Sequence, residues 1–334
     1  MTHSKPDPKL AVAPMMAWTD KHCRYLHRLF SPSVLLFTEM VTTAALLHGN
    51  QWHQLDFNPE EHPLALQLGG NDPIALRECA VRAAERGYDE VNLNVGCPSS
   101  RVQHGTFGAC LMRSPPLVAD CIAAMKDNVD ITVSVKCRLG VDEYDSDELL
   151  NEFIDKVSQA GCSRFYLHAR KAILGGLSPA QNRSIPPLQP ERVARLKARR
   201  PDLEIIVNGG ITQISQVEDH LTWADGVMIG RAAYQRPTFL TEIETLLATS
   251  SHANRKPAAQ PSIEEILSRY LDYIAAQLAQ GERLHAMTRH MLSLCNGLPG
   301  ARRYRQILSD SKRLKLNDLG LLEEALTHVF KVAA

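Results

Sequence analysis

Eight short apolar runs, separated by longer amphipathic segments, most constrain how this chain folds. The runs are mostly continuous and rich in Leu and β-branched residues, as expected for parallel strands covered on both faces. Eight such units over about 240 residues have the size of an α/β fold, the (β/α)8 or TIM barrel. The predicted strands are residues 10–13, 34–38, 64–68, 90–95, 132–137, 164–168, 204–208 and 226–230.

The segments between these runs have helical patterns, and several begin with Asp or Ser followed by Pro or an acidic residue. A doubly wound sheet is the competing architecture, but it normally carries a glycine fingerprint after its first strand. Here Pro14-Met15-Met16-Ala17 follows the first strand, so the barrel is favoured. The clearest helices are predicted at residues 73–86, 115–127, 145–160 and 190–199.

The alternation ends at residues 248–261, a stretch rich in Ser, Ala, Asn and Pro that is typical of a linker. No strand pattern follows it. The prediction is a barrel over residues 1–247 and a small all-helical domain over residues 248–334. Helices are expected at residues 263–278, 282–294, 301–308 and 319–332.

Charge is unevenly distributed along the chain, although its formal net charge is zero. From residue 251 onward there are 12 Lys and Arg against 8 Asp and Glu, so this part carries +4 and the remainder −4. A basic helical face is either a solvated surface or a binding surface for a polyanion, and composition alone leaves both open.

Cysteine usage and the lack of targeting signals indicate a cytoplasmic enzyme. The eight cysteines are scattered, with no Cys-x-x-Cys pair and no zinc-type spacing to His, so we expect reduced thiols and no metal. No apolar run is long enough for a membrane span, and the N-terminal residues lack the apolar core of a signal peptide. We expect a monomer that does not bind membranes.

Glycine-rich turns follow the last two predicted strands. They are Asn208-Gly209-Gly210 and Gly230-Arg231. Function in such a barrel lies at the carboxyl ends of the strands, and turns after strands seven and eight commonly bind phosphate through backbone N–H groups. An arginine adds a charge-assisted contact, so the pattern predicts a phosphate site.

Three polar residues end strands three, five and six: Gln67, Lys136 and His168. Beside a phosphate site they indicate bound flavin mononucleotide (FMN). Gln67 would bond the pyrimidine edge, and Lys136 would stabilise the anionic reduced ring near its N1/O2 end. Taken alone, Lys136 could be a buried lysine paired with an acidic group, and His168 could be a histidine of the core. The prediction therefore rests on the combination.

Cys97 follows the fourth predicted strand, in Gly96-Cys97-Pro98-Ser99. This sequence places a thiol where a strand leaves the sheet. A free thiol, with a pKa of about 8.5, is mostly protonated at neutral pH, so Cys97 is predicted to be a general acid. A thiolate nucleophile is the rival role and would need a base, for which His104 is a candidate. A buried structural cysteine is the remaining interpretation.

In combination and order, these motifs resemble the tRNA-dihydrouridine synthases, specifically subfamily A. The resemblance runs through most of the barrel. The residues that carry it are 13–15, 67–69, 94–99, 107–109, 111–112, 136–140, 168–171, 207–211 and 230–232.

The resemblance implies reduction of the uridine C5=C6 bond in tRNA to dihydrouridine, by an FMN barrel followed by a helical tRNA-binding domain. It implies NADPH as the transient reductant, Cys97 as the proton donor, and Asn94 at the target base. It assigns the flavin contacts to Pro14, Met15, Met16, Gln67, Lys136, His168, Asn208, Gly209, Gly210, Gly230 and Arg231.

Subfamily A is indicated by residues 176–183, 185–188 and 300–305, and it implies D-loop uridines 20 and 20a as substrates. One departure is Ala180, where the subfamily commonly has lysine, so one tRNA contact is in doubt. Phosphate contacts hold RNA without reading its sequence. The residues expected to make them are Arg183, Arg302 and Arg305.

Two alternatives remain on the sequence alone. An FMN-dependent reductase of a free small molecule, such as a pyrimidine or an enone, would share the barrel and the loop cysteine but would not need a basic helical tail. A non-enzymatic tRNA-binding module would not need Cys97. The full set of predicted cofactor residues favours the tRNA-modifying enzyme.

Overall fold

The computed structural model describes residues 9–99, 102–103, 105–250 and 261–330. These residues form two compact units. One unit contains the described residues up to Thr19 and Ser33–Gly230. The other contains Asp20–Pro32 and the described residues from Arg231 onward. Within the described ranges, no helix combines the length and the apolar character that crossing a membrane requires.

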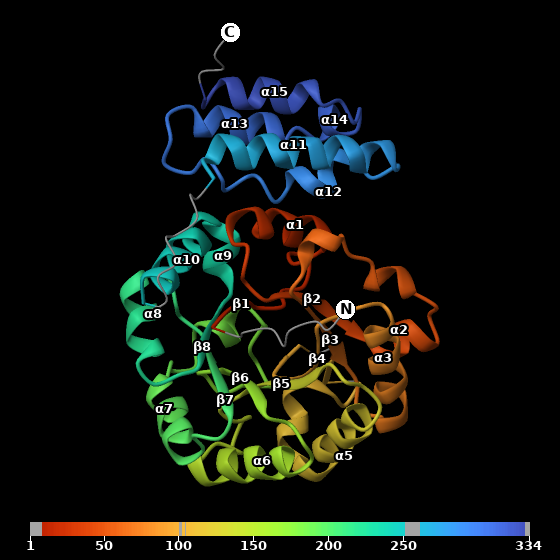
Figure 1. Cartoon of the computed structure of the whole chain (residues 1–334), viewed down its shortest axis with the longest axis vertical. Coiled ribbons are helices and arrows are strands. Elements are labelled where there is room, and N and C mark those ends of the chain that lie inside the picture. Colours follow the sequence, from red (N-terminus) through yellow and green to blue (C-terminus); the bar gives the residue numbers. More distant parts are fainter. Residues whose placement is uncertain (1–8, 100–101, 104, 251–260, 331–334) are drawn as a thin grey trace. The chain divides into compact units, whose positions relative to one another are not determined.

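The first unit is built on eight parallel strands in the order β1-β8-β7-β6-β5-β4-β3-β2. The sheet closes because Ala11 of β1 bridges Leu35, just before β2, and the Leu35 N–H donates to the Leu10 carbonyl at 2.9 Å. Figure 1 shows the resulting ring of strands and confirms the predicted barrel. The strands are β1 (Leu10–Val12), β2 (Leu36–Thr42), β3 (Leu64–Gly69), β4 (Glu90–Val95), β5 (Thr132–Arg138), β6 (Arg164–His168), β7 (Glu204–Asn208) and β8 (Gly226–Ile229).

Strands β4, β6 and β7 have the predicted bounds, whereas β2 differs most from its prediction at residues 34–38. Its pairing with β3 continues past an irregularity between Phe37 and Met40 and reaches the pair Thr42 and Gly69. The polar residues of this extension interrupt the apolar pattern, so a search for apolar runs ends the strand too early.

Helices between the strands begin where the sequence provides capping groups. The Asp72 carboxylate accepts the Ile74 N–H at the start of α3, and Ser146 accepts the Leu149 N–H at the start of α6. The helices of this unit are α2 (Thr43–Leu47), α3 (Pro73–Glu85), α5 (Pro115–Lys126), α6 (Asp147–Gln159), α7 (Pro190–Arg199) and α8 (Ile214–Leu221), with short 3-10 segments η1 (Trp52–Leu55), η2 (Pro59–Glu61), η3 (Gly108–Arg113) and η4 (Gln181–Arg183).

Side chains fill the interior of the barrel, so it is a packed core and not a channel. Phe37 and Tyr166 meet edge to face, with ring centroids 5.1 Å apart, and both are fully buried. The same cluster includes small residues such as Ala11 and Ala65, which leave room for the two rings. Function is therefore left to the ends of the strands.

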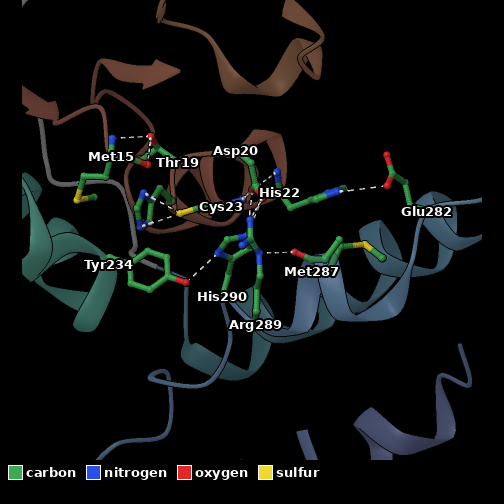
Figure 2. Close-up of polar contacts among 12 residues, drawn as sticks. Met15, Thr19, Asp20, His22, Cys23, Tyr234, Glu282, Met287, Arg289 and His290 are labelled. Atoms are coloured by element: carbon green, nitrogen blue, oxygen red, sulfur yellow. Dashed lines mark hydrogen bonds and ion pairs between the residues drawn. The ribbon is translucent and has the colours of Figure 1, made fainter. Parts of the chain in front are cut away.

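Among the described residues of the second unit, all regular secondary structure is helical, and it includes α1, which precedes most of the barrel in sequence. Asp20 caps α1 by accepting the N–H groups of His22 and Cys23, and it also pairs with Arg289 and His290 (Figure 2). The helices are α1 (Lys21–Phe30), α9 (Arg231–Gln235), α10 (Thr238–Ser250), α11 (Ile263–Ala279), α12 (Leu284–Thr288), α13 (Ala301–Leu308), α14 (Ser311–Leu314) and α15 (Gly320–Thr327).

The helix predicted at residues 282–294 is shorter than expected, because α12 ends at Thr288. Beyond it the chain makes tighter turns, in which the N–H groups of Met291 and Leu294 bond carbonyls three residues earlier. Part of the predicted linker is helical, since α10 continues to Ser250. Residues 251–260 of that linker lie outside the described residues.

Candidate active site

Five predicted site residues end neighbouring strands: Gln67 (β3), Asn94 (β4), Lys136 (β5), His168 (β6) and Asn208 (β7). Strand register pairs Asn94 with Lys136, and His168 with Asn208. The Lys136 Nζ donates to the Asn208 Oδ1 at 3.2 Å, so these side chains converge although β6 separates their strands. We refer to these five residues as the barrel mouth.

The barrel mouth lies among positive charges. Burial lowers the pKa of His168 well below its ordinary value, and Arg138, Lys136, Arg170 and Arg183 lower it further. Burial also lowers the pKa of Lys136 to about 8, with Arg138 acting in the same direction. Cations that lower one another's pKa favour an anionic ligand, which would relieve their mutual repulsion.

Two observations at this mouth fit a bound cofactor. The His168 Nδ1 is buried and has no hydrogen-bond partner among the residues that the structure describes. A Cβ added at Gly230 would meet only the Ala13 Cβ, at 3.9 Å, so packing within the protein does not itself require glycine there. With the nearby cations, these features fit FMN, which has an anionic phosphate and a ring with hydrogen-bonding edges.

The glycines after β7 have backbone conformations that side chains rarely adopt. Gly209 and Gly210 have φ angles of +117° and +72°. A Cβ at Gly209 would lie 2.9 Å from the His168 Cδ2, and one at Gly210 would overlap Leu188. Glycine at both positions therefore lets the turn pass close to the histidine ring.

Cys97 lies on a loop whose backbone is held by four hydrogen bonds. The Asn94 Oδ1 accepts the N–H groups of Gly96 and Cys97, at 3.1 and 2.9 Å. The Arg138 Nε donates to the Gly96 carbonyl at 2.9 Å, and the Ala109 N–H donates to the Cys97 carbonyl at 3.0 Å. The Cys97 side chain is half-buried, so a fixed backbone presents a thiol that remains accessible.

Electrostatics connect this thiol to the barrel mouth. Negative charge on Cys97 raises the pKa values of Lys136 and Arg138. Lys136 and Arg138 therefore lie close enough to Cys97 for a charge at its sulfur to act on them. His104, the candidate base for the nucleophilic role, lies outside the described residues.

Other predicted residues occupy separate positions. Pro14, Met15 and Met16 follow β1, and Met16 is 60% exposed. The Thr19 Oγ1 accepts the Met15 N–H at 3.0 Å and holds this turn (Figure 2). Arg231 is the exposed first residue of α9.

Of the residues expected to bind tRNA, Asn94 is buried and the three arginines are solvent-exposed. Arg183 ends η4 in a loop fixed by the buried Asn182, whose side chain accepts the Ile173 N–H and donates to the Ile173 carbonyl, both at 2.8 Å. Arg302 and Arg305 lie on the exposed face of α13, opposite the buried Tyr304 and Ile307.

Arg138 is a site residue that the sequence prediction did not assign. It is buried and donates to the carbonyls of Gly96, Lys171 and Asn182, so it ties the Cys97 loop to the loop that carries Arg183. Its position two residues after Lys136 was the available signal, because alternate residues of a strand share a face.

Comparison with known proteins gives a consistent answer. Residues 11–331 match the family described as Dihydrouridine synthase (Dus). A tRNA-dihydrouridine(20/20a) synthase of Shewanella oneidensis is 55% identical, over 91% of this chain and 89% of that protein. Proteins of the same name are 51% identical in Vibrio parahaemolyticus, over 99% of both chains, and 50% identical in Escherichia coli K12, over 95% of this chain and 90% of that protein.

The family match includes all five residues of the barrel mouth and the Cys97 loop. It also extends through α13 into the helical C-terminal region. The chain belongs to the dihydrouridine synthase family.

Proposed function

We propose that this chain reduces the uridine C5=C6 bond in tRNA to 5,6-dihydrouridine, at D-loop positions 20 and 20a. The name shared by relatives at 50 to 55% identity supports the substrate and the positions. The observation that carries the chemistry is the accessible Cys97 thiol beside the cationic barrel mouth. This pairing supplies both a proton source and a place for an anionic cofactor.

FMN is the cofactor in this proposal, with NADPH as the external reductant. Lys136, Gln67 and His168 would hold the ring. The turns at Asn208, Gly209, Gly210, Gly230 and Arg231 would hold the phosphate, and Pro14, Met15 and Met16 would line the site. The bound flavin supplies a hydride to one carbon of the uracil double bond.

Cys97 supplies the proton in this proposal. The uracil carbon next to the one that takes up hydride receives the thiol proton, which leaves a thiolate. Lys136 and Arg138 stabilise this negative charge, and the thiolate regains a proton from water before the next turnover. Asn94 holds the loop by accepting the Cys97 N–H, and in this proposal it would also face the target base.

Cys97→Ala tests this role. We expect tRNA binding and FMN content to remain near wild-type values while turnover falls by about 100-fold or more, as is usual when a general acid is removed. Pre-steady-state absorbance of the flavin, followed after tRNA is added to the reduced enzyme, measures the step directly. Turnover close to wild type would exclude Cys97 as the proton donor.

The tRNA contacts of the proposal are Arg183, Arg302 and Arg305, with residues 248–334 as the tRNA-binding domain and residues 1–247 as the catalytic domain. The target base must leave the tRNA fold to reach the mouth, because a paired or stacked base does not expose its double bond. We further propose that the enzyme is a cytoplasmic monomer. Light scattering with and without tRNA checks the oligomeric state.

Mass-spectrometric mapping of dihydrouridine tests the activity as a whole. A strain that lacks the gene is compared with the same strain carrying the wild-type chain or Cys97→Ala. We expect dihydrouridine at positions 20 and 20a to disappear, to return with the wild type, and to stay absent with the variant. Unchanged dihydrouridine at every tRNA position would overturn the proposal and direct the search to small-molecule substrates.

A further inference from the structure

A continuous chain of buried side chains runs from Glu90, at the start of β4, to the Cys97 loop. The Ser134 hydroxyl donates to the Glu90 Oε1 (2.5 Å), and the Asn92 Nδ2 donates to the Ser134 Oγ (2.7 Å). The Gln67 Nε2 donates to the Asn92 Oδ1 (2.8 Å), and the Asn94 Nδ2 donates to the Gln67 Oε1 (2.8 Å). The Asn94 Oδ1 then accepts the backbone N–H groups of Gly96 and Cys97.

Every donor in this chain points away from the loop and toward Glu90. The loop end requires this direction, because the N–H groups of Gly96 and Cys97 can only donate and so need the Asn94 oxygen. Each amide then presents its nitrogen to the next oxygen along the chain. Ser134, which accepts from Asn92, is left with its single hydrogen for Glu90.

The Glu90 end fixes the same direction independently. Its Oε2 accepts the Arg164 Nη1 at 2.6 Å and the Tyr166 hydroxyl at 3.3 Å. Burial raises the pKa of Glu90, and the Arg164 guanidinium opposes that shift. Glu90, Asn92 and Ser134 have no exposed surface, so water does not compete for these bonds.

We propose that Glu90 is a positioning residue for the reaction: as a buried acceptor it sets the orientation of the Asn92, Gln67 and Asn94 amides and thereby holds the backbone of Cys97. Glu90 is at the opposite end of β4 from the loop and touches no reacting group. The inference rests on the proposed role of Cys97 as proton donor.

Glu90→Gln is the informative substitution because it preserves shape and turns an acceptor into a donor; it also removes the charge that pairs with Arg164, which a control must match. The Arg164 guanidinium requires the glutamine oxygen, which turns the glutamine NH₂ toward Ser134. The bond in which Ser134 donates to residue 90 is then lost: either the Ser134 oxygen accepts from both amides, which leaves its own hydrogen without that acceptor, or every member of the chain reverses. A reversed chain would place the Asn94 NH₂ against the N–H groups of Gly96 and Cys97, where no hydrogen bond can form.

Glu204→Gln is the matched control. Glu204 accepts the Arg164 Nε at 2.6 Å, as Glu90 accepts the Nη1, but it is not part of the chain to Cys97. A merely structural role for the ion pairs of Arg164 would make the two variants alike. The proposal predicts that only Glu90→Gln affects the loop.

Hydrogen–deuterium exchange of the FMN-loaded enzyme tests the proposal without measuring activity. We expect the Gly96 and Cys97 amides to exchange about tenfold faster in Glu90→Gln. The net free energy of one hydrogen bond corresponds to a factor of about this size. Exchange in α5 should not change, and Glu204→Gln should resemble the wild type. Ser134→Ala breaks the same chain without touching Arg164, so it provides the test if Glu90→Gln does not fold.

Flavin reoxidation by tRNA gives the functional measure. We expect both chain variants to slow this step by about 10- to 100-fold, because small displacements of a reacting group have effects of this size. In a Cys97→Ala background the same substitutions should add little. Unchanged loop exchange in both Glu90→Gln and Ser134→Ala would overturn the positioning role. Unchanged turnover in Cys97→Ala alone would instead overturn the proposed proton donor.

Discussion

Lys136 is a site residue whose buried charge lowers the stability of the folded protein. Its amine donates to Asn208, and the Arg138 guanidinium acts on it as a like charge. Burial lowers its pKa from an ordinary value of 10.5 to about 8. Below pH 8 the folded protein therefore pays the full penalty of a desolvated ammonium, and this penalty disappears as pH rises through the interval between the two pKa values.

We predict that Lys136→Met stabilises the flavin-free protein at pH 7 by about 2 kcal/mol, because it removes that buried charge. The stability advantage of the variant should shrink as pH rises from 8 to 10, where wild-type Lys136 folds neutral. FMN affinity should fall at the same time. Urea unfolding at several pH values measures the first effect, and fluorescence titration measures the second. A variant less stable than wild type at pH 7 would refute the argument.

The sequence predicted that the residues of the barrel mouth lie close together, because parallel strands bring their carboxyl ends together whatever the details of the helices. It did not predict the contacts of Asn94, whose carboxamide joins Gln67 to the Cys97 loop. Amide orientation depends on strand register and on neighbours distant in sequence, so no local pattern contains it.

At the scale of elements, the start of η3 contacts the Cys97 loop, where the Ala109 N–H donates to the Cys97 carbonyl. Gly108 begins η3 with a φ angle of +73°, and a Cβ there would lie 2.7 Å from the Cys97 carbonyl oxygen and would overlap Val102. Gly87 also has a positive φ, of +92°, but a Cβ there would meet nothing within 4 Å. A substitution at Gly87 therefore introduces backbone strain alone, whereas a substitution at Gly108 also displaces the Cys97 loop.

We predict that Gly108→Ala lowers kcat by about 10- to 100-fold because it moves the Cys97 backbone. Gly87→Ala should lower stability by about 1 kcal/mol through backbone strain alone and leave kcat unchanged. Steady-state kinetics on tRNA, with thermal unfolding of both variants, make the comparison. Equal kcat values for the two variants would mean that contact between Gly108 and the Cys97 carbonyl does not matter for the reaction.

Elements with a strong local signal were predicted closely, and those that depend on tertiary contacts were not. The bounds of α7 and α13 match the prediction, since Pro begins one and a clear apolar face defines the other. Helix α1 was not foreseen in the helical unit. Its contacts with α11, including a stacked pair of Tyr25 and Tyr273 with centroids 3.9 Å apart, join segments about 250 residues apart in sequence.

For the whole molecule, the separation of charge along the chain has a function in the proposal. The part from residue 251 onward carries +4, and the remainder carries −4. The barrel mouth is nevertheless cationic, so its charge is local and suits a single cofactor phosphate. The exposed face of α13 bears Arg302, Arg303 and Arg305, as a surface that binds an extended polyanion would.

Salt dependence distinguishes these two uses of positive charge. Each phosphate contact releases counterions, so removing one should make the plot of log affinity against log salt shallower by about one unit. We predict this change for Arg302→Ala, together with a raised KM for tRNA and an unchanged kcat at saturation. Arg77→Ala, which removes an exposed charge from α3 of the barrel, is the matched control and should leave the slope unchanged. Binding isotherms at several salt concentrations measure the slope. If Arg302→Ala instead lowered kcat at saturating tRNA and left the slope unchanged, Arg302 would not be a phosphate contact, and α13 would have to act on the reaction in another way.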